Sequence, residues 1–198
     1  MGEMHGAAAL CHLLQRALAS LPSGASGVAA QVGQHSAPVE AILKPDEAQQ
    51  AVDACVRALA LLTTCGSVIS STSTDMQHHM GAELLHRVLA SPSAGESAWG
   101  NAALCVSHCV GQAQLRAQLS TRVQAPAPEN DELRGAPTAV EAQEDLVAAL
   151  LQVAHRSKGG VAARNAGIAL AKLAQEPHAL ARLKEMRGLE IIHATVRG

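Results

Sequence analysis

One ten-residue pattern occurs twice in this chain and constrains the fold more than any other feature. The first copy is Asn101–Val110 (NAALCVSHCV) and the second is Asn165–Ala174 (NAGIALAKLA), which begins 64 residues later. Internal similarity of this kind is the signature of a repeat protein, in which each unit buries its apolar face against the next. The chain is therefore expected to consist of similar units packed in series.

Each copy is preceded by a second shared pattern. Leu84–Leu89 and Leu146–Leu151 both place apolar residues at positions i, i+1, i+4 and i+5, which is a helical stripe. Each unit is thus predicted to be an apolar helix, a short turn and an alanine-rich helix. A fainter third unit lies upstream, where Leu13–Leu18 repeats the stripe and Ala58–Leu62 repeats the alanine-rich helix.

The composition favours helices that pack closely together. Apolar residues make up 48% of the chain, but Phe and Tyr are absent and there is one Trp. Large aromatic side chains usually anchor β-sandwiches and ligand pockets, whereas Ala and Leu have the highest helix propensities. No segment shows the alternating pattern of a strand, so the predicted class is all-α.

The repeats predict a single helical domain over 1–198 with four parts. These are a degenerate N-terminal unit at 1–66, a repeat at 80–120, an acidic, proline-containing disordered insert at 121–138, and at 139–198 a repeat that leads into a further unit. Without the 18-residue insert the spacing of the copies falls from 64 to 46. Helices are expected at about 4–19, 45–64, 75–89, 97–110 with Ser97 as N-cap, 112–119, 139–156, 161–175, 177–186 and 189–196, and a Ser/Thr-rich loop at 66–74.

A helical wheel separates each alanine-rich helix into two sides. One side is small and apolar: Ala102, Ala103, Cys105, Val106, Cys109 and Val110 in the first copy, and Ala166, Gly167, Ala169, Leu170, Leu173 and Ala174 in the second. The other side carries Asn101, Leu104 and His108, and Asn165, Ile168 and Lys172. The first side is predicted to be buried and the second to be open, so that replacing Lys172 leaves stability unchanged.

Charge and cysteine usage indicate a cytoplasmic protein. The net charge is −2, but residues 154–198 carry eight basic and three acidic side chains, which favours an acidic partner. The five cysteines have no paired spacing typical of a secreted disulfide framework. The N-terminus does not resemble a signal peptide, and no apolar run is long enough to span a membrane. Few aromatic residues are available for stacking on bases, so nucleic acid is not expected as a partner. A membrane is not expected as a partner either.

The alanine-rich helices resemble the third helix of armadillo repeats. Residues 102–109 and 166–173 carry this resemblance, which implies a right-handed helical solenoid that binds proteins on its concave face. Peptide-binding members have an Asn where this chain has His108 and Lys172, and an aromatic residue where it has Leu104 and Ile168. These departures disfavour capture of an extended peptide.

A narrower resemblance covers about residues 80–198. Gly100–Cys109, Arg164–Leu173 and Arg187–Ile192 are similar to the C-terminal armadillo region of the tetratricopeptide repeat protein twelve family. That family joins N-terminal tetratricopeptide repeats to an armadillo region and is implicated in cytoplasmic preassembly of axonemal dynein arms. No 34-residue tetratricopeptide unit occurs in this chain.

Two clusters of potential metal ligands are better interpreted as residues that bind no metal. Cys105, His108 and Cys109 share one helix, but a structural zinc site needs four ligands, usually from two segments. His79 and His86 are predicted to share a helix face as an ordinary surface pair. No nucleophile elbow, phosphate loop or dinucleotide fingerprint occurs. A hydrolase or transferase with a Cys–His pair stays open as an alternative.

The sequence predicts a non-catalytic scaffold in axonemal dynein arm preassembly, without cofactor or metal. Its partners are expected to be dynein arm subunits or assembly chaperones, and a general cochaperone or transport adaptor is the alternative of the same class. The predicted partner-binding residues are Asn101, Leu104, His108, Arg164, Asn165, Ile168 and Lys172.

Overall fold

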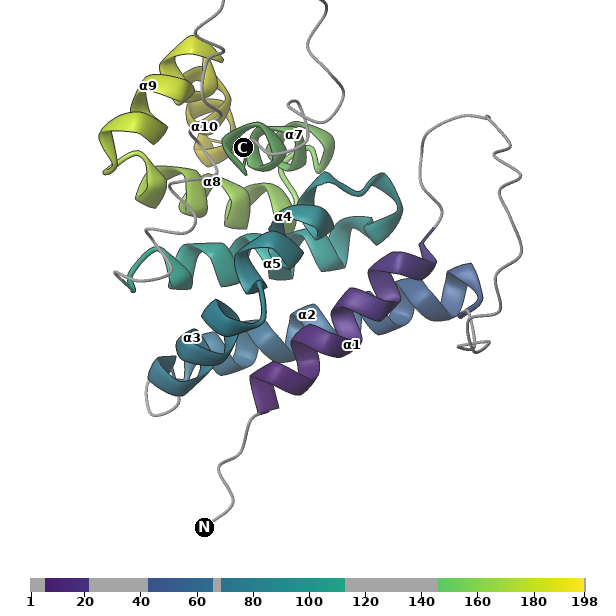
Figure 1. The fold of residues 1–198 in the computed structure, drawn as a ribbon. Coiled ribbons are helices and arrows are strands. Elements are labelled where there is room, and N and C mark those ends of the chain that lie inside the picture. The colour runs from purple at the N-terminus through teal and green to yellow at the C-terminus, as the bar shows by residue number, and fades with distance from the viewer. Residues whose placement is uncertain (1–5, 22–42, 66–68, 113–145, 198) are drawn as a thin grey trace, which may run out of the picture.

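The computed structural model describes residues 6–21, 43–65, 69–112 and 146–197, and every regular element in these ranges is helical (Figure 1). The all-α class is confirmed for this part of the chain. The helices are α1 (Gly6–Ser20), α2 (Pro45–Thr64), α3 (Ile69–His78), α4 (Gly81–Ala90), α5 (Gly95–Cys109), α7 (Leu146–Arg156), α8 (Val161–Leu173), α9 (Pro177–Glu185) and α10 (Gly188–Arg197), with a 3₁₀ turn, η1, at Pro92–Ala94.

The two alanine-rich helices of the repeated pattern, α5 and α8, pack against each other along their lengths, and α5 also packs on α2. We call α2, α5 and α8 the helix row. The apolar helices α1, α4 and α7 pack against α2, α5 and α8 respectively, and α4 also contacts both α1 and α7. In Figure 1 the chain ascends through these pairs from α1 and α2 to α8 and α10.

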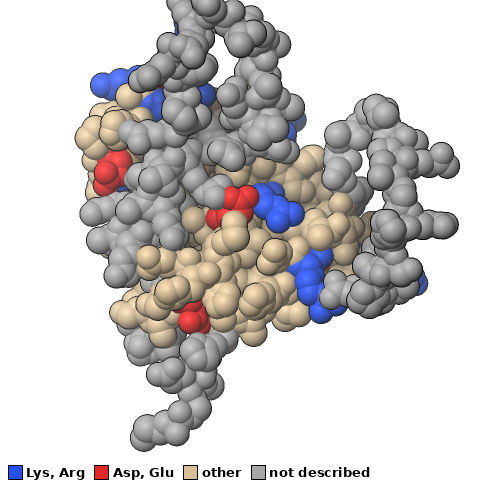
Figure 2. Space-filling view, in the orientation of Figure 1, with Lys and Arg blue, Asp and Glu red and all other residues tan. Residues whose placement is uncertain are grey.

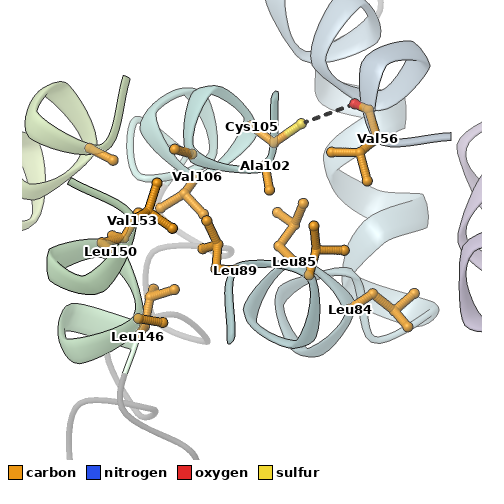
Figure 3. Packing of buried hydrophobic residues seen from close by; sticks show 14 of the residues in the cluster. Val56, Leu84, Leu85, Leu89, Ala102, Cys105, Val106, Leu146, Leu150 and Val153 are labelled. Atoms are coloured by element: carbon orange, nitrogen blue, oxygen red, sulfur yellow. Dashed lines mark hydrogen bonds between the residues drawn. The ribbon is translucent and has the colours of Figure 1, made fainter. Parts of the chain in front are cut away.

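The core is one continuous cluster of Ala, Leu, Val, Cys and Met side chains. Leu85 and Leu89 of α4 point toward Ala102 and Val106 of α5, and Leu150 of α7 approaches the same place (Figure 3). These five side chains are at most 1% exposed. Trp99 is only half-buried; its indole N–H donates to the carbonyl of Ser91 at 2.8 Å. Small and branched aliphatic residues therefore supply the packing that aromatic residues often provide.

The best-defined helix start is that of α2. Pro45 occupies the first turn with Asp46 and Glu47, as predicted, and the Glu47 carboxylate accepts from the Lys44 N–H at 3.3 Å. Proline has its φ preset for this position, and acids are favourable at a helix N-terminus. The expected span of 45–64 is confirmed.

The loop predicted at 66–74 is wrong for residues 69–74, and residues 66–68 lie outside the described ranges. The single helix predicted at 75–89 is divided by a turn at residues 79–80. Residues from Ile69 form α3, in which Thr72 and Met76 are buried and the Thr74 hydroxyl donates to the Ser70 carbonyl at 3.0 Å. Burial against α1, α2 and α4 outweighs the weak helix propensity of Ser and Thr. The chain then turns at Met80, which has a left-handed φ of 55°, before α4 begins at Gly81.

Where the helices are described, the remaining boundaries agree within a few residues, with one further correction. Helix α5 begins at Gly95 after η1, so Ser97 is not its N-cap. Residues 139–145 of the helix expected at 139–156 lie outside the described ranges, and α7 is described from Leu146. The expected helix at 112–119 extends beyond residue 112 into residues outside the described ranges, and the insert at 121–138 lies entirely outside them. Within the described residues, no helix is long and apolar enough to cross a membrane.

Gly100 of α5 lies close to the backbone of α8. A Cβ atom built at Gly100 would lie 3.3 Å from the Cα atom of Ala162, which is tighter than ordinary contact. We predict that Gly100→Leu lowers the free energy of unfolding by about 1–3 kcal/mol, because an inserted side chain forces the two helices apart. Denaturant unfolding measures this change.

The matched control is Gly6→Leu, since a Cβ at Gly6 meets nothing within 4 Å. This variant is expected to unfold at the same denaturant concentration as the parent chain or slightly higher. Equal stability of both variants would show that α5 and α8 are not in close contact at Gly100.

Candidate functional site

The seven predicted partner-binding residues lie on two neighbouring helices. Asn101, Leu104 and His108 are on α5, and Arg164, Asn165, Ile168 and Lys172 are on α8. Arg164 and Ile168 are exposed, and the other five are half-buried. The predicted apolar side of each helix is buried, except that Ala174 at the end of α8 is half-buried. The wheel therefore separated the two sides correctly, but most of the second side is less open than expected.

Asn165 joins α8 to α5. Its side-chain amide N–H donates to the Gly100 carbonyl at 3.0 Å. Gly100 lies within α5, and a carbonyl oxygen has a second lone pair available for such a bond. The small residues Gly100 and Ala162 lie between the two helices at this level, so the helices are close together. The Asn165 amide can therefore reach the backbone of α5. Asn165 thus fixes the position of α8 along α5.

Lys172 and His108 make equivalent contacts from equivalent positions of the repeated pattern. The Lys172 ammonium donates to the Ser107 carbonyl at 2.8 Å, in the last turn of α5. His108 Nδ1 lies 3.1 Å from the Thr63 carbonyl, in the last turn of α2, so the bond requires the proton on Nδ1. Carbonyls at helix C-termini lack partners within the helix and carry partial negative charge. Each bridge therefore satisfies the end of the preceding helix.

These bridges correct the expectation that Lys172 is open. Its side chain is half-buried and bonded across α5 and α8, so its replacement is expected to lower stability. The sequence pattern could not show this, because the acceptor is a backbone carbonyl of another helix. Among the seven residues, only Arg164 and Ile168 are exposed. Val161, which the wheel did not include, is 67% exposed on the same helix.

The cysteines near His108 behave as buried apolar side chains. The Cys105 thiol is directed at the Val56 carbonyl of α2, 3.8 Å away (Figure 3). Burial raises the pKa of the Cys109 thiol to about 12, with a smaller contribution from Cys11. Burial likewise raises the pKa of Cys11 to about 11 and that of Cys105 well above its usual value. Protonated thiols are poor nucleophiles, and His108 Nδ1 is engaged by Thr63.

The histidines at 78–86 do not form the predicted pair. His79 follows α3 and His86 is within α4, and the two segments are separated by the turn at Met80. His86 is buried, whereas the His79 ring packs edge-on against His12 of α1 with centroids 4.8 Å apart. In the described part of the chain, no group of three or more His, Cys, Asp or Glu residues could hold a metal ion.

A hollow of about 440 Å³ lies between the start of α2 and the start of α5. Its walls are polar and partly acidic, with Asp46, Asp53 and Glu96 among the lining residues. It contains neither a cysteine nor a histidine, so it does not bring together the Cys–His pair of the alternative enzyme reading. In the view of Figure 2, the visible Lys and Arg side chains do not join into one continuous patch.

Comparison with known proteins identified no family model, no curated protein and no solved structure that matches this chain. The interpretation of the site therefore depends on its own geometry.

The bridges make a testable set of stability differences. Asn165→Leu is expected to lower the free energy of unfolding by about 1 kcal/mol. It removes the hydrogen bond to the Gly100 carbonyl, while the leucine side chain fills the space of the amide. Lys172→Met should have a similar effect, and Lys172→Glu a larger one, because a carboxylate would face the carbonyl ends of α5. Arg164→Gln is the exposed control. Unchanged melting of Lys172→Glu would contradict the bridge.

Thiol accessibility tests the cysteine assignment. Cys65 is exposed, whereas Cys11, Cys55, Cys105 and Cys109 are buried. At pH 8 we expect an aromatic disulfide reagent to modify one thiol per native chain rapidly and the other four only as the chain unfolds. Cys65→Ser should remove the rapid phase. Rapid modification of Cys105 or Cys109 in the folded chain would indicate an accessible, reactive thiol instead.

Proposed function

We propose that this chain is a non-catalytic protein-binding scaffold of the armadillo type, a right-handed helical solenoid that acts in cytoplasmic preassembly of axonemal dynein arms. The observation that carries the proposal is the repeated bridge across the helix row: His108 bonds α5 to the end of α2, and Lys172 bonds α8 to the end of α5. Equivalent positions of a repeated sequence make the same contact twice, as expected for stacked units.

Burial along the row supports the same assignment. Ala98, Ala102 and Cys105 of α5 are fully buried, and so are Ala162, Ala166 and Ala169 of α8, each 64 residues later. The helices α4 and α7 that precede them also pack on each other. A solenoid produces this arrangement because each unit buries its apolar side against the unit before it.

The binding surface is assigned to the side of α5 and α8 that carries the seven residues. Bridging fixes Asn165, His108 and Lys172, so these three hold the spacing and shape of the surface. Arg164, Ile168 and Val161 are exposed and are assigned the direct contact with a partner. Rigid elements hold such contact residues with little loss of conformational freedom on binding.

The expected partner is acidic. Residues 154–198 have a net charge of +5, and Arg156, Lys158 and Arg164 at the α7–α8 junction are all exposed. Complementary charge mainly accelerates association and selects between partners, and it weakens with salt. Dynein arm subunits and assembly chaperones are proposed on the family resemblance of Gly100–Cys109, Arg164–Leu173 and Arg187–Ile192.

Two features argue against the enzyme alternative. Burial holds the thiols of Cys105 and Cys109 in their protonated form, and the hollow near α2 has no nucleophile beside a histidine. A general cochaperone or transport adaptor would share the scaffold and differ in the proteins it captures.

Affinity purification from ciliated cells, followed by mass spectrometry, tests the proposal. The parent chain is expected to retain dynein arm subunits or their chaperones, and Arg164→Glu combined with Val161→Asp should reduce their recovery at least about tenfold, which corresponds to about 1.4 kcal/mol. Lys184→Glu, an exposed charge reversal on α9, is the control. Equal recovery by all three chains would reject this surface, and chaperones without dynein subunits would favour the general cochaperone.

A further inference from the structure

Each helix of the row α2–α5–α8 has two packing faces. In α5, the face toward α2 carries Cys105, whose thiol reaches the Val56 carbonyl, together with Ala98, Ala102 and Cys109 at helical spacing. The face toward α8 carries Gly100, Leu104 and Ser107, where the Gly100 and Ser107 carbonyls accept from α8. We call the first the trailing face and the second the leading face.

The neighbouring helices follow the same scheme. The trailing face of α8 consists of Ala162, Ala166, Ala169 and Leu173, all at most 1% exposed. The leading face of α2 consists of Val56, Ala60 and Thr63, all at most 3% exposed. Both contacts inside the row therefore join a leading face to a trailing face.

Among the described residues, two faces of the row carry exposed side chains. The trailing face of α2 carries Ala54, Ala58, Leu61 and Cys65, where Leu61 is 65% exposed. The leading face of α8 carries Arg164, Ile168 and Ala171, where Ile168 is 44% exposed. The equivalent positions elsewhere in the row are mostly buried. Leu61 and Ile168 are thus large apolar side chains on the two surfaces that are covered inside the row.

We propose that these open faces bind each other between two copies of the chain, so that α2 of one copy packs on α8 of the next. A second copy supplies the kind of face that is paired twice inside the row, with Leu61 and Arg164 as larger residues at two of its positions. Leu61 would take the place that Cys105 and Ala169 occupy at the internal contacts. This proposal does not rest on the dynein-related function proposed above, but it uses Arg164 and Ile168, so a second copy and that partner would compete for the same face of α8.

The polar edge of the contact also has a counterpart. Arg57 and Thr64 of α2 stand where α8 carries Asn165 and Lys172, the residues that donate to carbonyls of α5. The Arg57 side chain is 63% exposed and pairs with Asp53 at 3.3 Å on its own helix, so it retains donors for a second acceptor. At the new contact the Arg57 guanidinium would donate to the carbonyl of Arg164 of the partner subunit, whereas the Thr64 hydroxyl already donates to the Leu61 carbonyl at 2.7 Å.

Arg164 limits the strength of this association. It stands at the position equivalent to Gly100, where an added Cβ atom would lie 3.3 Å from the Ala162 Cα atom of the neighbouring helix. Val56 of α2 shows that a Cβ atom is tolerated at this position, whereas a long charged side chain must be displaced. Arg164→Ala is therefore expected to strengthen self-association at least about tenfold, a change of about 1.4 kcal/mol.

The contact joins different faces of each copy, so it does not close on itself in a dimer and mass should grow with concentration. Sedimentation velocity of the full chain over a wide concentration range measures this growth. Leu61→Asp blocks the trailing face and Ala171→Arg blocks the leading face, and each alone is expected to be monomeric. Their equimolar mixture should form a one-to-one dimer and nothing larger, because one intact face of each kind remains.

Met80→Asp is the control, since it places the same charge at an exposed apolar residue in the turn between α3 and α4, where Asp tolerates the left-handed φ. It should associate like the parent chain, and circular dichroism should show that all variants are folded. A parent chain and an Arg164→Ala chain that stay monomeric at every concentration would overturn the proposal. Association of Ala171→Arg but not Leu61→Asp would also overturn it, because a symmetric α2–α2 contact would explain that result.

Discussion

Close packing of small residues between the helices of the row α2–α5–α8 is the constraint on which the rest of the structure depends. Gly100, Ala162 and their neighbours hold the backbones of α5 and α8 near enough for a side chain of one helix to reach a carbonyl of the other. A larger residue at Gly100 would separate the helices and break the Asn165 bridge at the same time. The dispersion contacts and the polar bridges therefore both depend on the distance between α5 and α8.

This coupling explains why the polar residues of the repeated pattern have a structural role. Lys172 and His108 place donors at the carbonyl ends of the preceding helices, where charge and unpaired acceptors favour them. Because the bridges set the helix spacing, they also set the shape of the surface between the helices. A partner would then contact Arg164, Ile168 and Val161, whose side chains are exposed, on a surface that is already ordered.

The chemistry of the core agrees with a binding role. Cys105 and Cys109 contribute volume and little polarity, and their burial disfavours the thiolate that catalysis or metal binding would require. The same property makes the trailing faces of α5 and α8 compatible with tight helix packing. On α2 the corresponding face is open, and it ends in the exposed Leu61 and Cys65.

Periodicity in the sequence determined the helical class, the extent of α2 and the division of α5 and α8 into a buried side and a polar side, since 3.6-residue spacing acts locally along one helix. It was wrong for Ile69–His78, where Ser and Thr favour a loop but burial of Thr72 and Met76 against other helices stabilises α3. Tertiary structure alone decided which groups Asn165, His108 and Lys172 bond, because their acceptors are backbone carbonyls that carry no sequence signal. It also decided which copies of the same apolar face are covered. The faces on α5 and α8 are buried against the preceding helix of the row, whereas Leu61 and Cys65 on the equivalent face of α2 are exposed.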